Sequence, residues 1–490
     1  MSKVRVSSRV EESVNGFDDG DLDHAPATSL GIYLDGINEG LEPLEDYQDG
    51  GFHPVHLGDA LGASNRYRVI HKLGHGGFGT VWLCRDSQDL LGYVAVKVMV
   101  ADINPENLQD LTLTRVNQTS PGAEYIGIPL DSFSITGPNG EHQCIVLPVL
   151  GPCVSPRLWL SLKDPVPILR KMAYQSVLAM KFLHENNLCH GDFRPSNILV
   201  KLTSLDKLSE DELLLLIGTP VKTSVRTESG KELPTSSPRY LTIPADLSKL
   251  SDKYLTDQIC IIDLGETFSI SAPPEDLGIP ENYLPPEVLL EQENAISPAC
   301  DLWALCCTLF EIREQFALFY MIFDKDELLA EMVRFFGKPP KELWDTWEAR
   351  GYFFDDQGVW LRHGDDEDWS LEVALSKSTQ TIVQGEGGKG ESGKSLITPT
   401  DEQALMADLL YKLFRWDPEE RLTIEEVLTH PWFKILNQQE CETEGLFMII
   451  AGGESTASAI RSILVHTTTT PRVYFKLKAE IMAAMDEENL

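Results

Sequence analysis

The stretch HGDFRPSN, residues 190–197, decides the fold of this chain. Asp192 precedes Asn197 by five residues, so one short loop presents both a carboxylate and an amide oxygen. The carboxylate can accept the proton of a hydroxyl group, and the amide oxygen can bind a divalent cation. Residues 167–187, directly before the loop, have apolar side chains three and four positions apart, which predicts a long amphipathic helix.

A glycine-rich stretch nearer the N-terminus is the second constellation. GHGGFGTV, residues 74–81, lies between two runs whose apolar residues alternate as in antiparallel strands. Glycines let the backbone close over a phosphate chain, and its amides donate hydrogen bonds to the phosphate oxygens. Dinucleotide-binding turns share the glycine pattern but lead into a helix. Here a strand follows, and Lys97, in the sequence AVK, comes 18 residues after Gly79.

Further motifs follow in a fixed order. Asp263 ends a short apolar run in IIDLG, where its carboxylate can bind Mg²⁺. PPE at residues 285–287, DLWAL at residues 301–305 and Arg421 complete the set. This ordered set is typical of protein kinases, in which Glu287 and Arg421 are expected to form a buried ion pair.

The segment EDYQDGGFHPVHLGD, residues 45–59, narrows the resemblance. Together with residues 66–83 it resembles the N-terminal signature of SR-protein kinases. PRYLTIPADL (238–247) and DLGETF (263–268) resemble the fungal SR-kinase-like branch. The resemblance covers residues 44–435. It implies an α+β, bilobal protein-kinase-like fold with a small β-rich N-lobe and a larger, mostly helical C-lobe.

The resemblance, together with the acidic and glycine-containing composition of the N-terminal residues, implies a division of the chain into parts. Residues 1–43 are expected to be a mobile acidic N-terminus, and residues 44–149 the SR-kinase-like segment plus the N-lobe. Residues 150–436 are expected to form the C-lobe, with insertions near 201–258 and 362–400. Residues 437–490 form a tail that shows no interpretable pattern.

Catalytic roles follow from the same resemblance, with ATP and Mg²⁺ as cofactors. Lys97 would hold the α- and β-phosphates, and Asp192 would orient the attacking hydroxyl. Asn197 and Asp263 would bind Mg²⁺. Arg194 stands where most kinases have a lysine on the γ-phosphate, and its forked guanidinium changes the geometry of that contact.

The nucleotide site implied by the resemblance combines the glycine-rich stretch with neighbouring strand residues. Leu147 falls at the gatekeeper position, and the backbone of residues 148–150 would pair with adenine. The expected lining residues are Leu73, Gly74, His75, Gly76, Gly77, Phe78, Gly79, Val81, Ala95, Lys97, Leu147 and Leu150.

Two departures from the kinase pattern concern activation. Asp110 stands where the glutamate partner of Lys97 is expected, and Glu106, on the same helix face, is the alternative. Gly191 replaces the arginine that would pair with a phosphorylated activation loop. We therefore predict an enzyme that does not need phosphorylation of that loop.

Charge restricts the partners of this chain. It has 490 residues, with 41 Lys and Arg against 76 Asp and Glu, which gives a net charge of −35. Such an acidic surface repels nucleic acid, and it either attracts basic proteins or only keeps the protein soluble. The resemblance to SR-protein kinases implies Arg/Ser-rich, splicing-type proteins as substrates, and the acidic balance suits such basic partners. No apolar run reaches the roughly 18–20 residues of a membrane span. Nine cysteines without a C-x-x-C pair indicate a reduced, intracellular protein, cytoplasmic and nuclear by family resemblance.

Two other functions stay open at this stage. An aminoglycoside-type phosphotransferase also has an H-G-D loop, but the glycine-rich stretch, residues 285–287 and Arg421 argue against it. A pseudokinase that serves as a binding platform is favoured by Asp110 and Arg194, although the catalytic set is present.

The sequence GKGESGKS, residues 388–395, matches a phosphate-binding loop, but it lies in a glycine-rich insertion without the required strand and helix. We reject it as a nucleotide site.

Overall fold

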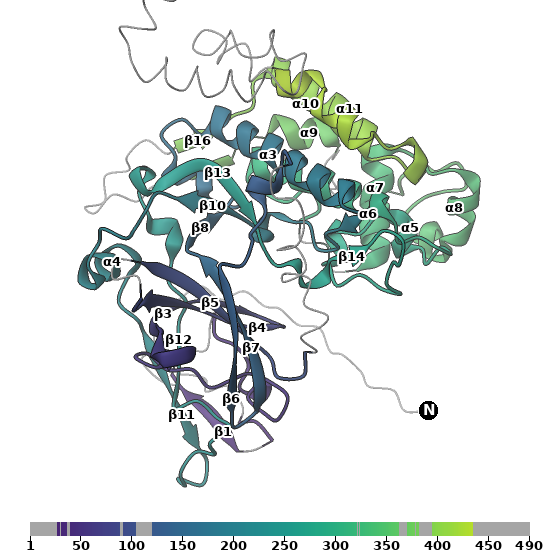
Figure 1. Cartoon of the computed structure of the whole chain (residues 1–490). Helices are drawn as coiled ribbons and strands as arrows, with labels where there is room; N and C mark the ends of the chain where they lie inside the picture. Colours follow the sequence, from purple (N-terminus) through teal and green to yellow (C-terminus); the bar gives the residue numbers. More distant parts are fainter. Residues whose placement is uncertain are drawn as a thin grey trace, which may run out of the picture. The chain divides into compact units, whose positions relative to one another are not determined.

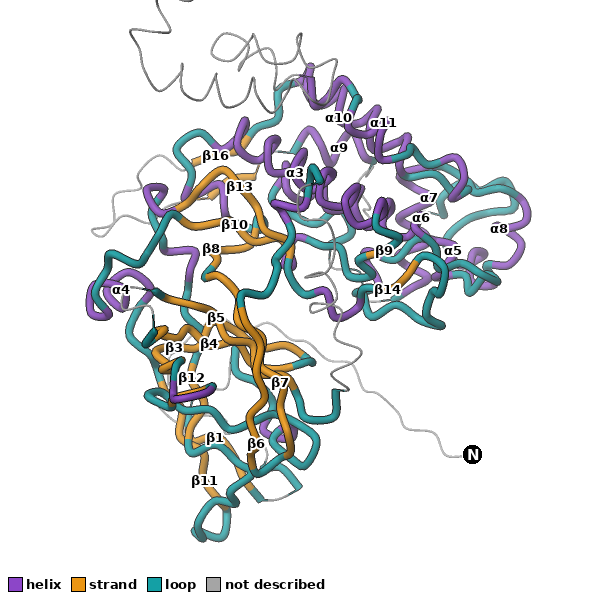
Figure 2. Tube along the Cα trace, in the orientation of Figure 1, coloured by secondary structure: helices purple, strands orange, loops and turns teal. Residues whose placement is uncertain are grey.

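The computed structural model describes residues 27–29, 31–36, 40–88, 92–103, 120–320, 322, 324–361, 370–377, 379–381 and 394–434. The chain forms two compact units, drawn in Figures 1 and 2. The first unit comprises Met1–Cys153 and Asn197–Phe268, and the second comprises Val154–Ser196 and Ser269–Leu490. The first is rich in strands and the second in helices, as Figure 2 shows by colour, which confirms the predicted α+β class.

A six-stranded antiparallel sheet is the centre of the first unit. Its strand order is β2-β3-β4-β5-β7-β6. The strands are β2 (Ala60–Leu61), β3 (Tyr67–Gly76), β4 (Gly79–Asp86), β5 (Tyr93–Met99), β6 (Asp131–Gly137) and β7 (Gly140–Pro148). Alternation along β5 gives the sheet two different faces, because successive side chains of a strand point to opposite sides.

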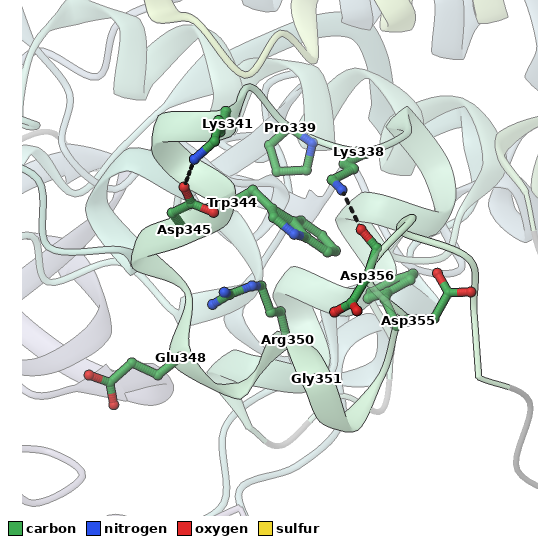
Figure 3. A pocket seen from close by; sticks show the side chains of 11 residues that line it. Lys338, Pro339, Lys341, Trp344, Asp345, Glu348, Arg350, Gly351, Asp355 and Asp356 are labelled. Carbon is green, nitrogen blue, oxygen red and sulfur yellow. Dashed lines mark hydrogen bonds and ion pairs between the residues drawn. The ribbon is translucent and has the colours of Figure 1, made fainter.

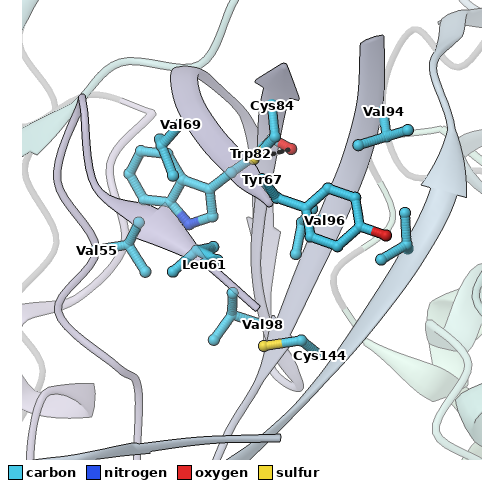
Figure 4. Close-up of a cluster of buried hydrophobic side chains, with 11 residues drawn as sticks. Val55, Leu61, Tyr67, Val69, Trp82, Cys84, Val94, Val96, Val98 and Cys144 are labelled. Carbon is cyan, nitrogen blue, oxygen red and sulfur yellow. Dashed lines mark hydrogen bonds between the residues drawn. The ribbon is translucent and has the colours of Figure 1, made fainter. Parts of the chain in front are cut away.

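One face of this sheet carries a hydrophobic core (Figure 4). Val94, Val96 and Val98 of β5 belong to it, together with Trp82 of β4. Val55, from the SR-kinase-like segment, packs into the same core and is 2% exposed. That segment is therefore part of the folded unit and not an appendage.

Two smaller sheets complete the first unit. One has the order β13-β10-β8, formed by β8 (Leu150–Cys153), β10 (Ile198–Leu202) and β13 (Leu255–Ile261). The other has the order β1-β11-β12, formed by β1 (Ile32–Asp35), β11 (Lys222–Thr227) and β12 (Tyr240–Thr242). The helix α4 (Glu210–Ile217) begins with a capping box in which Ser209 and Glu212 satisfy each other's backbone amides.

The sheet β1-β11-β12 differs from two expectations. Residues 32–35 were expected to be mobile, yet Ile32 is 1% exposed and β1 pairs with β11 in register, Ile32 opposite Thr227. Residues 201–258 were expected to be a C-lobe insertion, yet residues 197–268 belong to the first unit. The physical reason is burial: β1 and β11 bury their apolar side chains in one shared cluster, which neither strand could cover alone.

Helices form most of the second unit. They are α2 (Leu158–Ser161), α3 (Pro165–Glu185), α5 (Pro286–Leu289), α6 (Pro298–Glu314), α7 (Lys325–Phe336), α8 (Lys341–Thr346), α9 (Leu371–Ser376), α10 (Thr400–Leu413) and α11 (Ile424–Leu428). Short strands are β9 (Leu188–Cys189), β14 (Phe268–Ser269) at the boundary of the units, β15 (Thr379–Thr381) and β16 (Lys394–Leu396). The amphipathic helix predicted over residues 167–187 is confirmed as α3, which packs against the almost wholly buried α6.

Buried ion pairs tie these helices together. Arg421 donates to both carboxylate oxygens of Glu287, over 2.7 and 2.6 Å, which confirms the predicted pair. Glu402 of α10 accepts hydrogen bonds from Arg313 of α6 and Arg170 of α3. All three of these side chains are at most 3% exposed.

Three further expectations concern the rejected phosphate-loop motif, the partner of Lys97 and the tail. Lys394 and Ser395, the last residues of the rejected phosphate-loop motif, lie in β16 and pair with β15, whereas a phosphate loop would lead into a helix there. Asp110, Glu106 and the tail 437–490 lie outside the described residues. Among the helices that are described, none is long and apolar enough to span a bilayer.

Candidate active site

Asp301, in the first turn of α6, holds the backbone of the catalytic loop. Its Oδ2 accepts hydrogen bonds from the amide of His190, at 2.8 Å, and from Nε2 of His184, at 2.9 Å. Its Oδ1 accepts one from the amide of Gly191, at 3.1 Å. Burial raises the pKa of Asp301, but the hydrogen bonds and the charges of His184 and His190 outweigh it, so the pKa lies below its usual value. Asp301 is thus an ionised scaffold carboxylate.

The glycine of the H-G-D sequence has a structural cause. Gly191 has a φ of +78°, in the left-handed region that residues with a Cβ avoid. Its amide must point at Asp301 for the hydrogen bond to form. Glycine therefore adopts the required backbone conformation without strain.

Asp192 and Arg194 lie together in the second unit. Nε of Arg194 donates to Oδ1 of Asp192 over 2.8 Å, and Asp192 is 7% exposed. The backbone between them is fixed because the hydroxyl of Thr308 donates to the carbonyl of Phe193. A carboxylate held this way is oriented by a charge-assisted hydrogen bond on one oxygen.

Lys97 and Asp263 meet in the first unit. Nζ of Lys97 lies 2.8 Å from Oδ1 of Asp263, and the two side chains are 12% and 34% exposed. The amide of Ile262 donates to the carbonyl of Asn197 over 2.9 Å, so the residue before Asp263 is hydrogen-bonded to the other proposed metal ligand. The first unit therefore contains Lys97, Asn197 and Asp263 in neighbouring positions.

The β5 strand explains how Lys97 reaches this place. Ala95 and Lys97 alternate with the core valines of β5, so they point to the opposite face of the sheet. Register places Val81 of β4 opposite Lys97 and Leu147 of β7 opposite Ala95. Directly opposite residues share a face, so these four side chains form one patch.

The glycine-rich turn joins β3 to β4. At Gly74, Gly76 and Gly77 an added Cβ would meet nothing within 4 Å, so the space beside these residues is open. Gly79 has a φ of +154°, and a Cβ there would collide with the carbonyl of Val98. Phe78, at the tip of the turn, packs close to Gly265. A Cβ added to Gly265 would lie 3.7 Å from the ring of Phe78.

The remaining predicted lining residues fall on the same elements. Leu73 and His75 belong to β3, and Leu150 begins β8 and is 8% exposed. The residues present fit ATP with a divalent metal, because open glycine amides and a lysine suit phosphate, and amide and carboxylate oxygens suit Mg²⁺. The structure thus brings Lys97, Asn197 and Asp263 together in one unit and Asp192 and Arg194 in the other.

Sequence analysis did not predict a buried polar cluster around Glu311 in the second unit. The hydroxyls of Tyr283 and Ser155 donate to Glu311 of α6, over 2.5 and 3.2 Å. Burial raises the pKa of Glu311, while these hydrogen bonds and the charge of Arg194 oppose the increase. Glu311 follows Asp301 by ten residues on a helix with apolar residues all round, so no periodicity singled it out.

A large cavity in the second unit lies apart from the motif residues (Figure 3). Its volume is about 640 Å³. Lys338 covers the ring of Trp344 at 4.5 Å, and Lys341 pairs with Asp345. Three basic side chains face four acidic ones around it, so its charge selects neither an anion nor a cation.

Comparisons with known proteins bear on this geometry. The protein kinase domain model matches residues 250–433. The chain is 28% identical to a serine/threonine-protein kinase SRPK of Physarum polycephalum, over 80% of this chain and 91% of that protein. It is 27% identical to the human dual specificity protein kinase CLK1, over 81% of this chain and 71% of that protein. The chain is a serine/threonine protein kinase.

Other relatives of this kinase agree. A serine/threonine protein kinase of Aspergillus fumigatus is 26% identical, over 80% of this chain and 90% of that protein. A crystal structure of a kinase domain is similar in fold, with a TM-score of 0.51 and 19% identity, over 77% of this chain and 98% of that one. The resemblance to SR-protein kinases is therefore confirmed: the kinase is related to the SRPK and CLK types.

Proposed function

We propose that this kinase transfers the γ-phosphate of Mg-ATP to serine in basic, Arg/Ser-rich proteins. The observation that carries the proposal is the set Lys97, Asn197 and Asp263 in the first unit, with Asp192 five residues before Asn197 in the chain. The net charge of −35 supports a basic substrate, because an acidic surface attracts one over long range.

Each side chain has a defined part in the proposed reaction. Bound Mg-ATP supplies the phosphoryl group and neutralises its charge. Lys97 would hold the α- and β-phosphates, and Asn197 and Asp263 would hold Mg²⁺. Asp192 accepts the proton of the substrate hydroxyl while the serine oxygen forms a bond to the γ-phosphorus. The bond from that phosphorus to the β–γ bridging oxygen breaks, and ADP leaves.

Arg194 serves Asp192 and the phosphate in turn. Its Nε orients the carboxylate of Asp192, and the other nitrogens of the guanidinium remain as donors for γ-phosphate oxygens. A lysine has one charged nitrogen and cannot share its donors in this fixed geometry. We propose that the arginine thereby positions both reacting groups.

Activity without phosphorylation of the activation loop is a second part of the proposal. Gly191 offers no charged side chain to a phosphate on that loop. Ser269 already accepts a hydrogen bond from Nδ2 of Asn187 over 2.8 Å, and its Oγ lies 2.8 Å from that of Ser271. The simultaneous replacement of Thr267, Ser269 and Ser271 by alanine should leave kcat within about twofold. A fall of tenfold or more would contradict this part.

Phosphate transfer to a peptide tests the main proposal. We expect the full chain to transfer radiolabelled phosphate from Mg-ATP to an Arg-Ser repeat peptide, and Asp192→Ala to lose this activity. A Lys-Ser repeat of equal charge is the matched substrate that separates a preference for arginine from a preference for positive charge. Tight binding of Mg-ATP without transfer to any basic peptide would favour the pseudokinase alternative. A kinase with such substrates is expected in the cytoplasm and nucleus.

A further inference from the structure

A buried ion pair lies directly below the glycine-rich turn. Lys72 precedes Gly74 by two residues on β3, and its side chain is fully buried. Its ammonium group pairs with Glu42, which is 2% exposed and lies 30 residues earlier in the chain. The hydroxyl of Tyr47 donates to the other oxygen of Glu42 over 2.7 Å. Glu42 is therefore held by two donors in a fixed orientation.

Charge burial makes this pair sensitive to the loss of either partner. Burial lowers the pKa of Lys72, and the charge and hydrogen bond of Glu42 oppose that change. Removing one partner of a buried pair leaves an uncompensated charge, which is strongly destabilising at that point of the structure. The strand must then shift, or Lys72 must lose its proton.

The backbone of the same residue is held from another direction. The amide of Ala245, in the segment after β12, donates to the carbonyl of Lys72 over 2.9 Å. Across the ladder, Lys72 lies opposite Trp82, and its Nζ is 5.7 Å from the centre of that ring. Lys72 is thus fixed by the N-terminal segment through its side chain and by residues after β12 through its backbone.

The N-terminal segment is also anchored beyond the end of β5, the strand that carries Lys97. The amides of Ala101 and Asp102 donate to the carbonyls of Gly51 and Gly50, at 3.2 and 3.0 Å. Val100 packs against the apolar cluster that contains Tyr47. One segment, residues 41–59, therefore braces two strands that present groups to the nucleotide.

We infer that Glu42 is a positioning residue for nucleotide binding, which it serves through Lys72. The inference rests on the proposed function, because it concerns the same nucleotide site. A Cβ added at Gly74, Gly76 or Gly77 would meet nothing within 4 Å, so the space beside these three residues is open. At the far end of the turn, Phe78 lies near Gly265, and its carbonyl accepts a hydrogen bond from the amide of Val100. At the near end, the turn continues from β3, which the pair of Glu42 with Lys72 fixes two residues before the first glycine.

The test, in the full chain, compares two buried acidic residues that each pair with a basic residue on β3 or directly before it. Glu42→Gln removes the charge next to Lys72, and Asp86→Asn removes the charge next to Arg66 at the opposite end of β3. Asp86 is a matched control because it is 5% exposed and accepts hydrogen bonds from Arg66 at 2.9 and 2.7 Å. For each variant, the dissociation constant for Mg-ATP is measured at a temperature well below unfolding, and the thermal midpoint is measured in a separate unfolding experiment.

We expect both variants to lower the thermal midpoint, and only Glu42→Gln to weaken Mg-ATP binding, by about tenfold. Equal effects of the two variants on Mg-ATP binding, or an unchanged dissociation constant for Glu42→Gln, would overturn the inference. If Glu42→Gln does not fold, Tyr47→Phe takes its place, because it removes one donor to Glu42 and keeps the ring. This variant should raise the dissociation constant for Mg-ATP two- to threefold. An unchanged constant would count against the inference. Failure of the unsubstituted chain to bind Mg-ATP would instead refute the proposed function.

Discussion

Nε of Arg194 donates a hydrogen bond to Oδ1 of Asp192 over 2.8 Å. The proposed base, Asp192, is therefore directly hydrogen-bonded to Arg194, the residue proposed to bind the γ-phosphate. The side chains are 31% and 10% exposed, and the ion pair is therefore only partly screened by water. A residue two positions away in the chain thus orients the carboxylate that must face the substrate hydroxyl.

Replacement of Arg194 should affect chemistry more than binding. We expect Arg194→Ala to lower kcat about 10- to 100-fold, because an electrostatic contact to the transition state is lost. The KM for ATP should change less than threefold. Arg194→Lys keeps the charge but removes the fork that orients Asp192, so we expect it to lower kcat by a smaller factor, about threefold to tenfold. Steady-state kinetics on a basic peptide measure both variants. An unchanged kcat in the lysine variant would show that the charge alone, and not the fork, is required.

Gly191→Ala tests the cause of the H-G-D sequence. Because Gly191 has a φ of +78°, an alanine there should lower the free energy of unfolding by about 1–2 kcal/mol, since its Cβ is strained in the left-handed region. The thermal midpoint should fall by roughly 3–6 °C. Gly351→Ala is the matched control in the same unit, because a Cβ there meets nothing within 4 Å and its φ is not in that region. Similar midpoints for the two variants would argue against backbone strain.

Loss of one partner from the buried pair of Glu287 with Arg421 should strongly destabilise the second unit. Glu287→Gln leaves the guanidinium of Arg421 buried without its counter-charge and should destabilise by about 3–5 kcal/mol. The double replacement Glu287→Leu with Arg421→Met removes both charges and should recover more than half of this loss, although Arg421 also donates to the carbonyl of Ala299. Urea unfolding of the two variants and of the unsubstituted chain measures the difference. A double variant as unstable as the single one would mean that the contact to Ala299 dominates.

Two histidines should make the first unit sensitive to acid. The rings of His53 and His142 lie 4.9 Å apart, and burial together with the charge of His142 lowers the pKa of His53 to about 4. Below an unfolded-state pKa of about 6.5 the unfolded chain binds a proton that the folded chain refuses, so stability falls from pH 6.5 towards pH 4. His53 should thereby lower the free energy of unfolding by about 1–3 kcal/mol between pH 6.5 and pH 4.

His53→Gln separates the contribution of His53 to the pH dependence of stability from that of the many carboxylates, which titrate in the same pH range. Unfolding measured at pH 7.5, 5.5 and 4.5 should show a shallower loss of stability in the variant than in the unsubstituted chain. Parallel curves would show that His53 takes up its proton equally in both states. Because the pKa of His142 is also lowered by burial, the doubly substituted chain should have a shallower dependence still.

Local patterns were enough to predict much of the site. The glycine-rich turn between two strands, the helix α3 and the ordered motifs around Asp192 and Asp263 depend on neighbours in the chain or on short spacings. The alternation along β5 also places Lys97 on the face opposite the core valines. Periodicity carries this information because each residue's environment repeats with the geometry of its own element.

Long-range pairing could not be predicted in the same way. Nδ2 of Asn139 donates to the carbonyls of Phe52 and Ser236, residues 87 and 97 positions away, and no pattern near any of the three indicates this. The pairing of β1 with β11 likewise turned a stretch expected to be mobile into part of a sheet.

The sequence by itself therefore determined the candidate catalytic groups and their order, because these depend on residue type and on spacing within short segments. The tertiary structure decided that residues 32–36, 40–59 and 219–245 belong to the same unit as the strands of the proposed nucleotide site. It also decided that Glu42 meets Lys72. Such contacts bury a charge or an apolar face of one segment against another, and a buried group's partner leaves no trace in the segment's own periodicity.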